Sequence, residues 1–234
     1  MDKSKQRLQI VEELNEAAEG GLDSAVERLD KYWMDAFSNH GGEKISCFPY
    51  AVKAGEIVIN ESDTNLVLPR LKAKWEKGID KTTSCYLITI DGKIAKIGAL
   101  KDGVKSLSFA QYLTGVAGSP SRRSAVVYTF ILSMLRNGCK VEVYHLTMNS
   151  VTNIDIPTIN GTINTDIHYS QYDIEKQNLA AYKNKTNGHI PLLNFKERNA
   201  TVPEAFDVIY YLVNKRTAKN KKYTSIEVAY TEAN

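Results

Sequence analysis

Cysteine is scarce in this chain, and no long apolar segment occurs in it. The three cysteines, Cys47, Cys85 and Cys139, stand far apart and form no Cys-x-x-Cys pair, so a thiolate zinc site is not expected. An odd number of thiols, behind a charged N-terminus without an apolar leader, indicates a reducing compartment. No apolar run approaches the roughly 20 residues that cross a bilayer. We therefore expect a cytoplasmic protein with no membrane partner.

An excess of either charge is also lacking, since 30 basic and 27 acidic residues leave a formal net charge of +3. A balance this close to neutral neither demands nor excludes a nucleic acid partner, because the distribution of basic residues matters more than their sum. Hydrophobic residues make up 43% of the 234 positions, which is ordinary for a soluble globular protein. A chain of this length can bury a core without disulfides or structural metals.

The strongest local signal is Asp91-Gly92, which lies between two runs rich in apolar and β-branched residues, 86–90 and 93–97. Asp-Gly favours a two-residue hairpin turn, because both turn positions need a positive φ. Tyr86 and Lys96 lie at even positions, one on each strand. We therefore expect pairing across the turn to bring them to one face of the hairpin.

Periodicity and turn signals predict the other elements of the chain. Apolar residues at helical spacing, with Gly or Ser signals at the ends, predict helices within residues 1–40, 66–77, 101–112, 119–136, 171–186 and 203–213. Short apolar runs predict strands at 56–59, 140–144 and 224–230. The segment 147–168 is predicted to be a polar loop that holds a small hairpin around Asn160-Gly161.

Two short motifs lie on the predicted hairpin at 86–97. Cys85-Tyr86-Leu87 stands on its first strand and Lys96-Ile97-Gly98 on its second. A loop, a helix, a strand and a helix that bears Glu175 follow them. This order resembles the core of the GIY-YIG nucleases, and in particular their restriction-endonuclease branch. The resemblance covers about residues 84–194.

The resemblance implies roles for single residues. Tyr86 matches a tyrosine that takes part in activating the attacking water, Lys96 matches the first position of the Tyr-Ile-Gly motif, and Tyr112 matches a histidine or tyrosine beside the active site. Glu175 matches the metal-binding glutamate, with Mg²⁺ or Mn²⁺ as the expected ion. Asn194 matches a C-terminal asparagine. Each also has an ordinary structural interpretation: a packed aromatic, an outward-facing strand lysine, a solvated helix glutamate or a turn asparagine.

One position departs from the family pattern. The family has an arginine four residues before Tyr112, where this chain has Ser108. An arginine there would clamp the scissile phosphate, which a serine cannot do. Lys105, about one helical turn upstream, could replace it, and so could Arg122 and Arg123 in the first turn of a helix whose N-terminus attracts anions. A third interpretation is that the catalytic arginine has been lost.

A basic segment follows the last predicted helix. Lysines beside aromatic side chains suit phosphate contact and base stacking, and a solvated tail is the plainer alternative. The segment consists of Lys215, Arg216, Lys219, Lys221 and Lys222, with Tyr210, Tyr211 and Tyr223 nearby. These basic residues, together with Lys105 and Asn194, are the candidate DNA contacts.

The predicted fold is α+β, a layered arrangement in which helices flank a small, mostly antiparallel sheet. Its parts are an N-terminal extension over residues 1–80, a nuclease-like core over 81–198, and a C-terminal helix and basic segment over 199–234. In family terms, additions of this kind supply DNA grip, specificity or homodimer contacts.

The function that the resemblance implies is metal-dependent hydrolysis of double-stranded DNA, either as a sequence-specific restriction enzyme or as a homing or phage nuclease. Ser108 motivates an alternative, a catalytically inactive module that binds DNA or a protein. In a third interpretation the hairpin resembles the family by chance. In that case Tyr86, Lys96, Tyr112 and Glu175 would not converge in one cleft.

Overall fold

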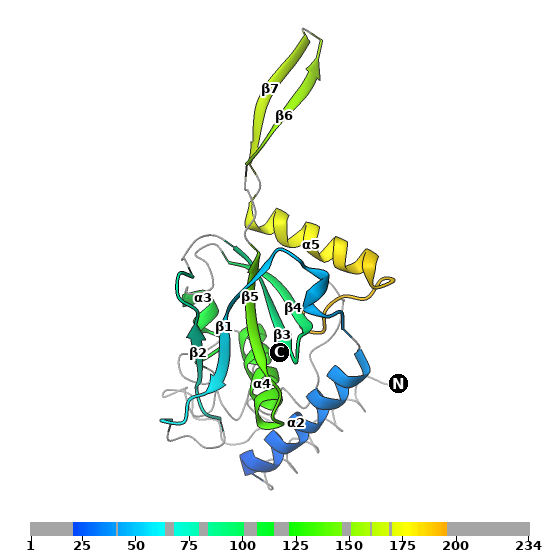
Figure 1. Ribbon diagram of the computed structural model, residues 1–234. Helices are drawn as coiled ribbons and strands as arrows, with labels where there is room; N and C mark the ends of the chain where they lie inside the picture. The colour runs from blue at the N-terminus through cyan, green and yellow to red at the C-terminus, as the bar shows by residue number, and fades with distance from the viewer. Residues whose placement is uncertain are drawn as a thin grey trace, which may run out of the picture.

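The computed structural model describes residues 21–40, 42–63, 68–79, 84–100, 107–114, 122–146, 151–159, 161–168 and 170–195. Its main sheet has five strands in the order β2-β1-β5-β3-β4, and each neighbouring pair is antiparallel. The strands are β1 (Ala51–Ile59), β2 (Leu71–Trp75), β3 (Ser84–Ile90), β4 (Lys93–Leu100) and β5 (Val141–Leu146). The predicted α+β fold with a small antiparallel sheet is confirmed (Figure 1).

Helices cover both faces of this sheet (Figure 1). On one face, α4 (Arg122–Arg136) packs against β1 and β5, and α2 (Gly21–His40) packs on α4. On the other face, α5 (Gln171–Lys185) packs against β3 and β4. A single turn, η1 (Ile45–Cys47), precedes β1, and the short helix α3 (Leu107–Ala110) precedes α4. The predicted helices at 119–136 and 171–186 and the helix before His40 are present within these bounds.

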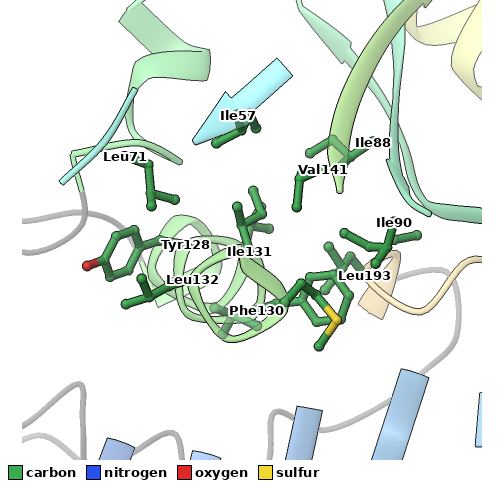
Figure 2. Packing of buried hydrophobic residues seen from close by; sticks show 14 of the residues in the cluster. Ile57, Leu71, Ile88, Ile90, Tyr128, Phe130, Ile131, Leu132, Val141 and Leu193 are labelled. Atoms are coloured by element: carbon green, nitrogen blue, oxygen red, sulfur yellow. The ribbon is translucent and has the colours of Figure 1, made fainter. Parts of the chain in front are cut away.

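The larger core lies between α4 and the sheet (Figure 2). α4 is buried all round, because the sheet covers one side of it and α2 the other, and Val126, Phe130 and Ile131 have no exposed surface. Trp33 of α2 is fully buried and meets the ring of Phe130 edge-on, with the ring centroids 5.4 Å apart. Burial on this scale makes α2 and α4 parts of one folded unit with the sheet.

A smaller core lies under α5. It contains Cys85 and Leu87 of β3, which alternate with the residues that face α4, and Ile174 and Tyr182 of α5. The N-terminus of α5 is fixed by a capping box, in which Ser170 and Asp173 exchange side chain-to-backbone hydrogen bonds. The predicted Ser170 cap is thus confirmed, and α5 presents a defined first turn above β3 and β4.

One sequence-based prediction was wrong. The segment 66–77 was predicted to be a helix, but Leu71–Trp75 forms strand β2 and pairs with β1. Leu71 is buried, whereas Lys72 and Lys74 are exposed, and this alternation has the period of a strand. The run is too short for helical and strand periods to be separated by hydrophobicity alone. Pairing along the edge of β1 decides the outcome.

A second, two-stranded sheet stands apart from the main one. β6 (Val151–Thr158) and β7 (Gly161–His168) pair with each other in antiparallel fashion and with no strand of the five-stranded sheet. The hairpin projects away from the rest of the molecule, beyond the first turn of α5 (Figure 1). The predicted hairpin around position 161 is present, but its strands take up most of the segment that was predicted to be a polar loop.

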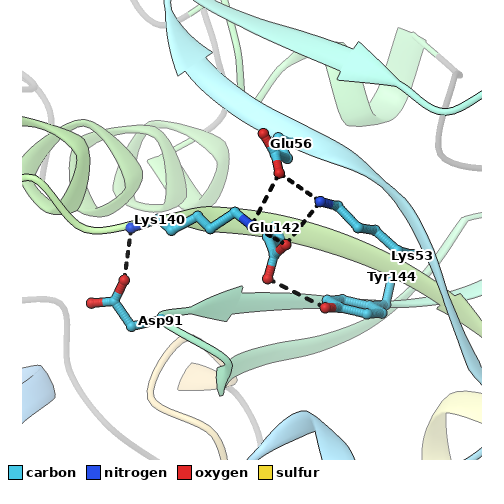
Figure 3. A network of polar contacts seen from close by, with 6 residues as sticks. All are labelled: Lys53, Glu56, Asp91, Lys140, Glu142 and Tyr144. Carbon is cyan, nitrogen blue, oxygen red and sulfur yellow. Dashed lines mark hydrogen bonds and ion pairs between the residues drawn. The ribbon is translucent and has the colours of Figure 1, made fainter.

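An ion-pair network joins β1 to β5 (Figure 3). Lys53 lies 2.5 Å from Glu56 and 2.9 Å from Glu142, and Lys140 lies 3.2 Å and 2.9 Å from the same two carboxylates. The backbone N–H of Lys140 also donates to Asp91 in the β3–β4 turn, at 2.8 Å. The network therefore ties three strands together at one end of the sheet, although each exposed pair contributes little alone.

Several predicted elements lie outside the described residues: the first helix before Gly20, the loop over 115–121, the helix at 203–213, and the strand at 224–230. Strands on both sides of position 80 belong to the same sheet. The domain boundaries that the sequence predicts at 80 and 198 stay predictions. Among the helices that the structure describes, none is long and apolar enough to cross a membrane.

Candidate active site

Two tyrosines from separate elements meet at the outer end of β3. The hydroxyl groups of Tyr86, on β3, and Tyr112, in the turn after α3, lie 3.1 Å apart and form a hydrogen bond. Phe109 of α3 packs edge-on against both rings, with centroid distances of 5.5 Å to Tyr86 and 5.4 Å to Tyr112. The Tyr86 side chain is fully buried. The aromatic cluster therefore fixes where the two hydroxyl groups point.

Gly98 makes room for the Tyr86 ring. Tyr86 pairs with Gly98 across the β3–β4 ladder. A Cβ atom at position 98 would lie 2.5 Å from Cζ and from the hydroxyl oxygen of Tyr86, a separation that real Cβ atoms do not show. Glycine at this position lets the phenol cross β4 toward the edge of the sheet, so Gly98 has a steric role in the site.

A bulge in β4 determines which residues share a face with Tyr86. An unbroken ladder from the Asp91-Gly92 turn would pair even positions of β3 with odd positions of β4, and Tyr86 and Lys96 would lie on opposite faces. The observed register shifts by one residue at Ala95, so that Lys96 pairs with Ile88. Tyr86 and Lys96 do share a face, as predicted, but because of the bulge and not because of their even numbers.

The outer edge of β4 is held by the segment after α5. The N–H of Leu193 donates to the carbonyl of the bulge residue Ala95, at 2.9 Å. The Asn194 amide accepts from the Ile97 N–H at 3.0 Å and donates to the Ile97 carbonyl at 2.8 Å. Asn194 is buried, and its amide is engaged with the backbone on both sides. This position supports the strand that carries Lys96; its predicted contact with DNA stays a prediction.

Glu175 adds a negative charge that acts on the tyrosine pair. It is half-buried on α5, one turn from the capped N-terminus. Burial raises the pKa of Tyr86 well above its ordinary value, and the neighbouring Tyr112 and then the charge of Glu175 raise it further. Burial and Glu175 also raise the pKa of Tyr112, although its hydrogen bond with Tyr86 acts in the opposite direction. The Cys85 thiol has a pKa raised to about 12, by burial first and Glu175 second.

These shifts define the protonation state of the site. Both phenols stay neutral at physiological pH and can donate hydrogen bonds, but neither is a ready base. A cation beside Glu175 would offset the negative charge that raises both pKa values. Within the described part of the chain, no group of three or more His, Cys, Asp or Glu side chains could hold a metal alone. A single carboxylate fits Mg²⁺, which keeps several waters and also binds substrate phosphates.

Of the residues predicted to bind phosphate, the structure describes the backbone of Arg122 and Arg123. Arg122 and Arg123 begin α4, and the hydroxyl of Ser124 in the same turn donates to Gln111 at 3.0 Å. Gln111 directly precedes Tyr112, so the start of α4 adjoins the tyrosine pair. The backbone of Ser108 lies in α3, one turn before Tyr112. The remaining predicted contacts lie outside the described residues: Lys105, Lys215, Arg216, Lys219, Lys221 and Lys222.

The structure thus joins the hydroxyl groups of Tyr86 and Tyr112, both of which feel the charge of Glu175, and places Lys96 on the same face of the hairpin as Tyr86. Sequence reasoning missed three contributors. The steric role of Gly98 was not predicted, although the motif that contains it was recognised. The bulge at Ala95 has no local sequence signal. Gln111 adjoins Tyr112 without any motif that would single it out.

Comparisons with known proteins match this chain to solved structures alone. No family model matches the chain, and no curated protein matches it in sequence. EndoII of bacteriophage T4, in a mutant form, is 19% identical with a TM-score of 0.40, over 64% of this chain and 96% of that one. The restriction endonuclease HPY188I, in complex with product DNA, is 20% identical with a TM-score of 0.35, over 62% of this chain and 83% of that one. The function of this chain has to be argued from its own residues.

Proposed function

We propose that this protein is a Mg²⁺-dependent endonuclease of the GIY-YIG kind that hydrolyses phosphodiester bonds of double-stranded DNA. One observation carries the proposal. Tyr86 of β3 and Tyr112 in the turn after α3 share a hydrogen bond although they lie 26 positions apart, and the charge of Glu175 on α5 acts on both phenols. This agreement with the residues that the resemblance singles out supports the proposal over a chance likeness.

The roles follow from the chemistry of the groups. Hydrolysis of a phosphodiester needs a water that loses a proton, positive charge near the non-bridging oxygens, and help for the leaving oxygen. Mg²⁺ bound at Glu175 would supply positive charge and a water of lowered pKa. Tyr86, as a neutral phenol, orients the attacking water, Lys96 accepts its proton when it is in the amine form, and Tyr112 holds the Tyr86 hydroxyl in place. Arg122 and Arg123 bind phosphate at the start of α4.

The test is cleavage of supercoiled plasmid and mixed linear DNA with Mg²⁺ by the wild type, a Glu175→Ala variant and a Glu27→Ala variant. Glu27 is an exposed glutamate on α2 and serves as the matched control. We expect Glu175→Ala to lower the cleavage rate by about a hundredfold or more and Glu27→Ala to leave it unchanged. Equal cleavage by wild type and Glu175→Ala, or no cleavage by the wild type, would contradict the proposal.

A second candidate function is a DNA-binding module that has lost its activity. Ser108, at the position of the family arginine, favours it. This function predicts DNA binding that weakens steeply with salt, without Mg²⁺-dependent cutting. A Ser108→Arg variant that gains strong cleavage, beside an inert wild type, would support the lost-activity alternative and contradict the first proposal.

A further inference from the structure

Two lysines face each other beside the turn of the β3–β4 hairpin. Lys44, in the segment before η1, forms an isolated antiparallel bridge with Lys93, the first residue of β4. Backbone hydrogen bonds of 2.8 Å and 2.9 Å join residues 43–45 to residues 92–94 on either side of this pair. Lys44 and Lys93 therefore form the narrow kind of antiparallel pair, in which the facing side chains lie closest together.

A pair of like charges at this position is unfavourable in the free protein. Side chains directly opposite in an antiparallel pair have Cβ atoms about 5 Å apart, and like charges there destabilise the pairing. Both lysines are exposed, and neither forms an ion pair with a carboxylate among the described residues. Glu43 and Ile45 flank Lys44 in extended backbone and point to the opposite face, where Ile45 packs against the smaller core. An anion bound between the two ammonium groups would relieve their repulsion.

Protection of a sheet edge does not account for this lysine pair. Exposed lysines on an edge strand commonly keep other strands from adding to the sheet. Lys72 and Lys74, which are exposed on β2, fit that role, because β2 is the strand at the far edge of the sheet. β4 is different, since residues 43–45 already occupy its outer edge beside Lys93. The charge of the lysine pair is therefore better explained by a ligand than by the edge.

The lysine pair lies on the face of β4 that leads to the candidate active site. Lys93 and Lys96 each pair with an isoleucine of β3, and both isoleucines belong to the larger core. The two β4 lysines therefore lie on one face of the strand, which is also the face of Tyr86. The Tyr86 phenol crosses β4 at Gly98. Lys93, Lys96 and the phenol thus follow one another along the strand.

The spacing along β4 favours an extended polyanion as the ligand. The strand rises about 17 Å between Lys93 and Gly98. Each strand of a DNA duplex carries one phosphate about every 3.4 Å along the helix axis, so this span corresponds to about five base pairs. A free phosphate cannot reach from the lysine pair to the tyrosine pair, whereas a duplex that lies along β4 contacts both at once.

We propose that Lys44 and Lys93 form a phosphate-binding surface, which holds the DNA backbone about five base pairs from the bond that is cut. The two ammonium groups contact neighbouring phosphates, and their mutual repulsion falls when DNA binds. Contacts of this kind position the duplex and carry no sequence information. The inference rests on the proposed function for the identity of its ligand, but it concerns binding and can be tested without cleavage.

The test is the dissociation constant of the full chain for a labelled DNA duplex, measured by fluorescence anisotropy over a range of salt concentrations without divalent metal, so that no DNA is cut. We expect the double variant Lys44→Gln, Lys93→Gln to bind about tenfold more weakly at about 50 mM salt. The slope of its log affinity against log salt should fall in magnitude by about 1.8, as the loss of two phosphate contacts requires. The double variant Lys72→Gln, Lys74→Gln removes the same charge from β2 and should leave both quantities unchanged.

Two further measurements separate binding from folding and from catalysis. Urea unfolding of the Lys44→Gln, Lys93→Gln protein should show no loss of stability, because the substitutions remove a like-charge pair. Affinity and slope equal to those of the wild type in this variant, or an equal loss in the β2 variant, would overturn the inference. Plasmid cleavage with Mg²⁺ tests the proposed function separately: a protein that binds DNA through Lys44 and Lys93 without cutting it contradicts the catalytic proposal alone.

Discussion

The β3–β4 and β6–β7 hairpins both have a glycine of positive φ at the turn and differ in their surroundings. β3–β4 turns at Asp91-Gly92, with φ values of 48° and 76°, and β6–β7 has Gly161 at a φ of 114°. β3 pairs with β5 on its other side, and α5 packs on the first hairpin, whereas β6 and β7 pair only with each other. The difference shows that a turn signal specifies a hairpin but says nothing of its surroundings.

The outer edges of the β3–β4 and β6–β7 hairpins also differ. The outer edge of β4 is occupied by Leu193 and Asn194, which satisfy the backbone of the bulge and of Ile97. The outer edge of β6 carries Pro157, which removes a donor. One edge is completed by the protein itself and can hold a site in place. The other edge is blunted against strand addition by its proline.

The largest effect should come from filling Gly98 in the packed hairpin. We expect Gly98→Ala to lower the free energy of unfolding by about 2–3 kcal/mol, because the new methyl group would overlap the Tyr86 ring. Urea unfolding followed by tryptophan fluorescence measures it, since Trp33 and Trp75 both lie in the main core.

Tyr86→Leu provides the control for that substitution. In the Gly98→Ala background it should recover part of the loss, because the two sites interact directly and their effects are not additive. A Gly98→Ala protein within about 0.5 kcal/mol of the wild type would show that the phenol can move aside, and the steric role of Gly98 would be wrong.

A smaller effect is expected where the edge of β4 is held. Asn194→Ala should cost about 2 kcal/mol of unfolding free energy, because it leaves the N–H and carbonyl of Ile97 without their partners in a buried place. The same unfolding assay measures it. Asn178→Ala on α5 is the matched control, because the Asn178 amide donates to the carbonyl of Ile174 within its own helix. Equal stability of the two variants would contradict a supporting role for Asn194.

The smallest effect is expected at the turn of the β6–β7 hairpin. Gly161→Ala strains a backbone with a φ of 114°, yet an added Cβ meets nothing within 4 Å. We expect the unfolding free energy of the main core to change by less than about 0.5 kcal/mol, while amide exchange in β6 and β7 becomes faster. A loss as large as that of Gly98→Ala would show that this hairpin and the main sheet unfold as one unit.

The sequence was informative wherever structure depends on neighbours in the chain. Asp91-Gly92 predicted the first hairpin, Ser170 predicted the cap of α5, and the apolar stripe from Val126 onward predicted α4. Each depends on residues within one or two turns of each other. The resemblance also singled out Tyr86 and Tyr112, whose hydroxyl groups form a hydrogen bond.

The sequence was uninformative wherever a distant segment decides the outcome. β2 is a strand because β1 lies beside it, and its five residues alone do not fix a period. The bulge at Ala95 is completed by Leu193, and the amide of Asn194 binds 97 positions away. The face on which Lys96 lies thus depends on a contact that no local pattern encodes.

The contact between Asn194 and Ile97 also has a consequence for the newly made chain. Ribosomes add about 5–20 residues per second, so the partners of the β4 edge emerge about 5–20 s after the strand itself. During that interval the edge beside Lys96 exposes unpaired backbone groups to any neighbouring strand. Completion of this edge is therefore a late event in synthesis, and a chain truncated before Asn194 would carry the hairpin motif but lack the bonds that hold β4.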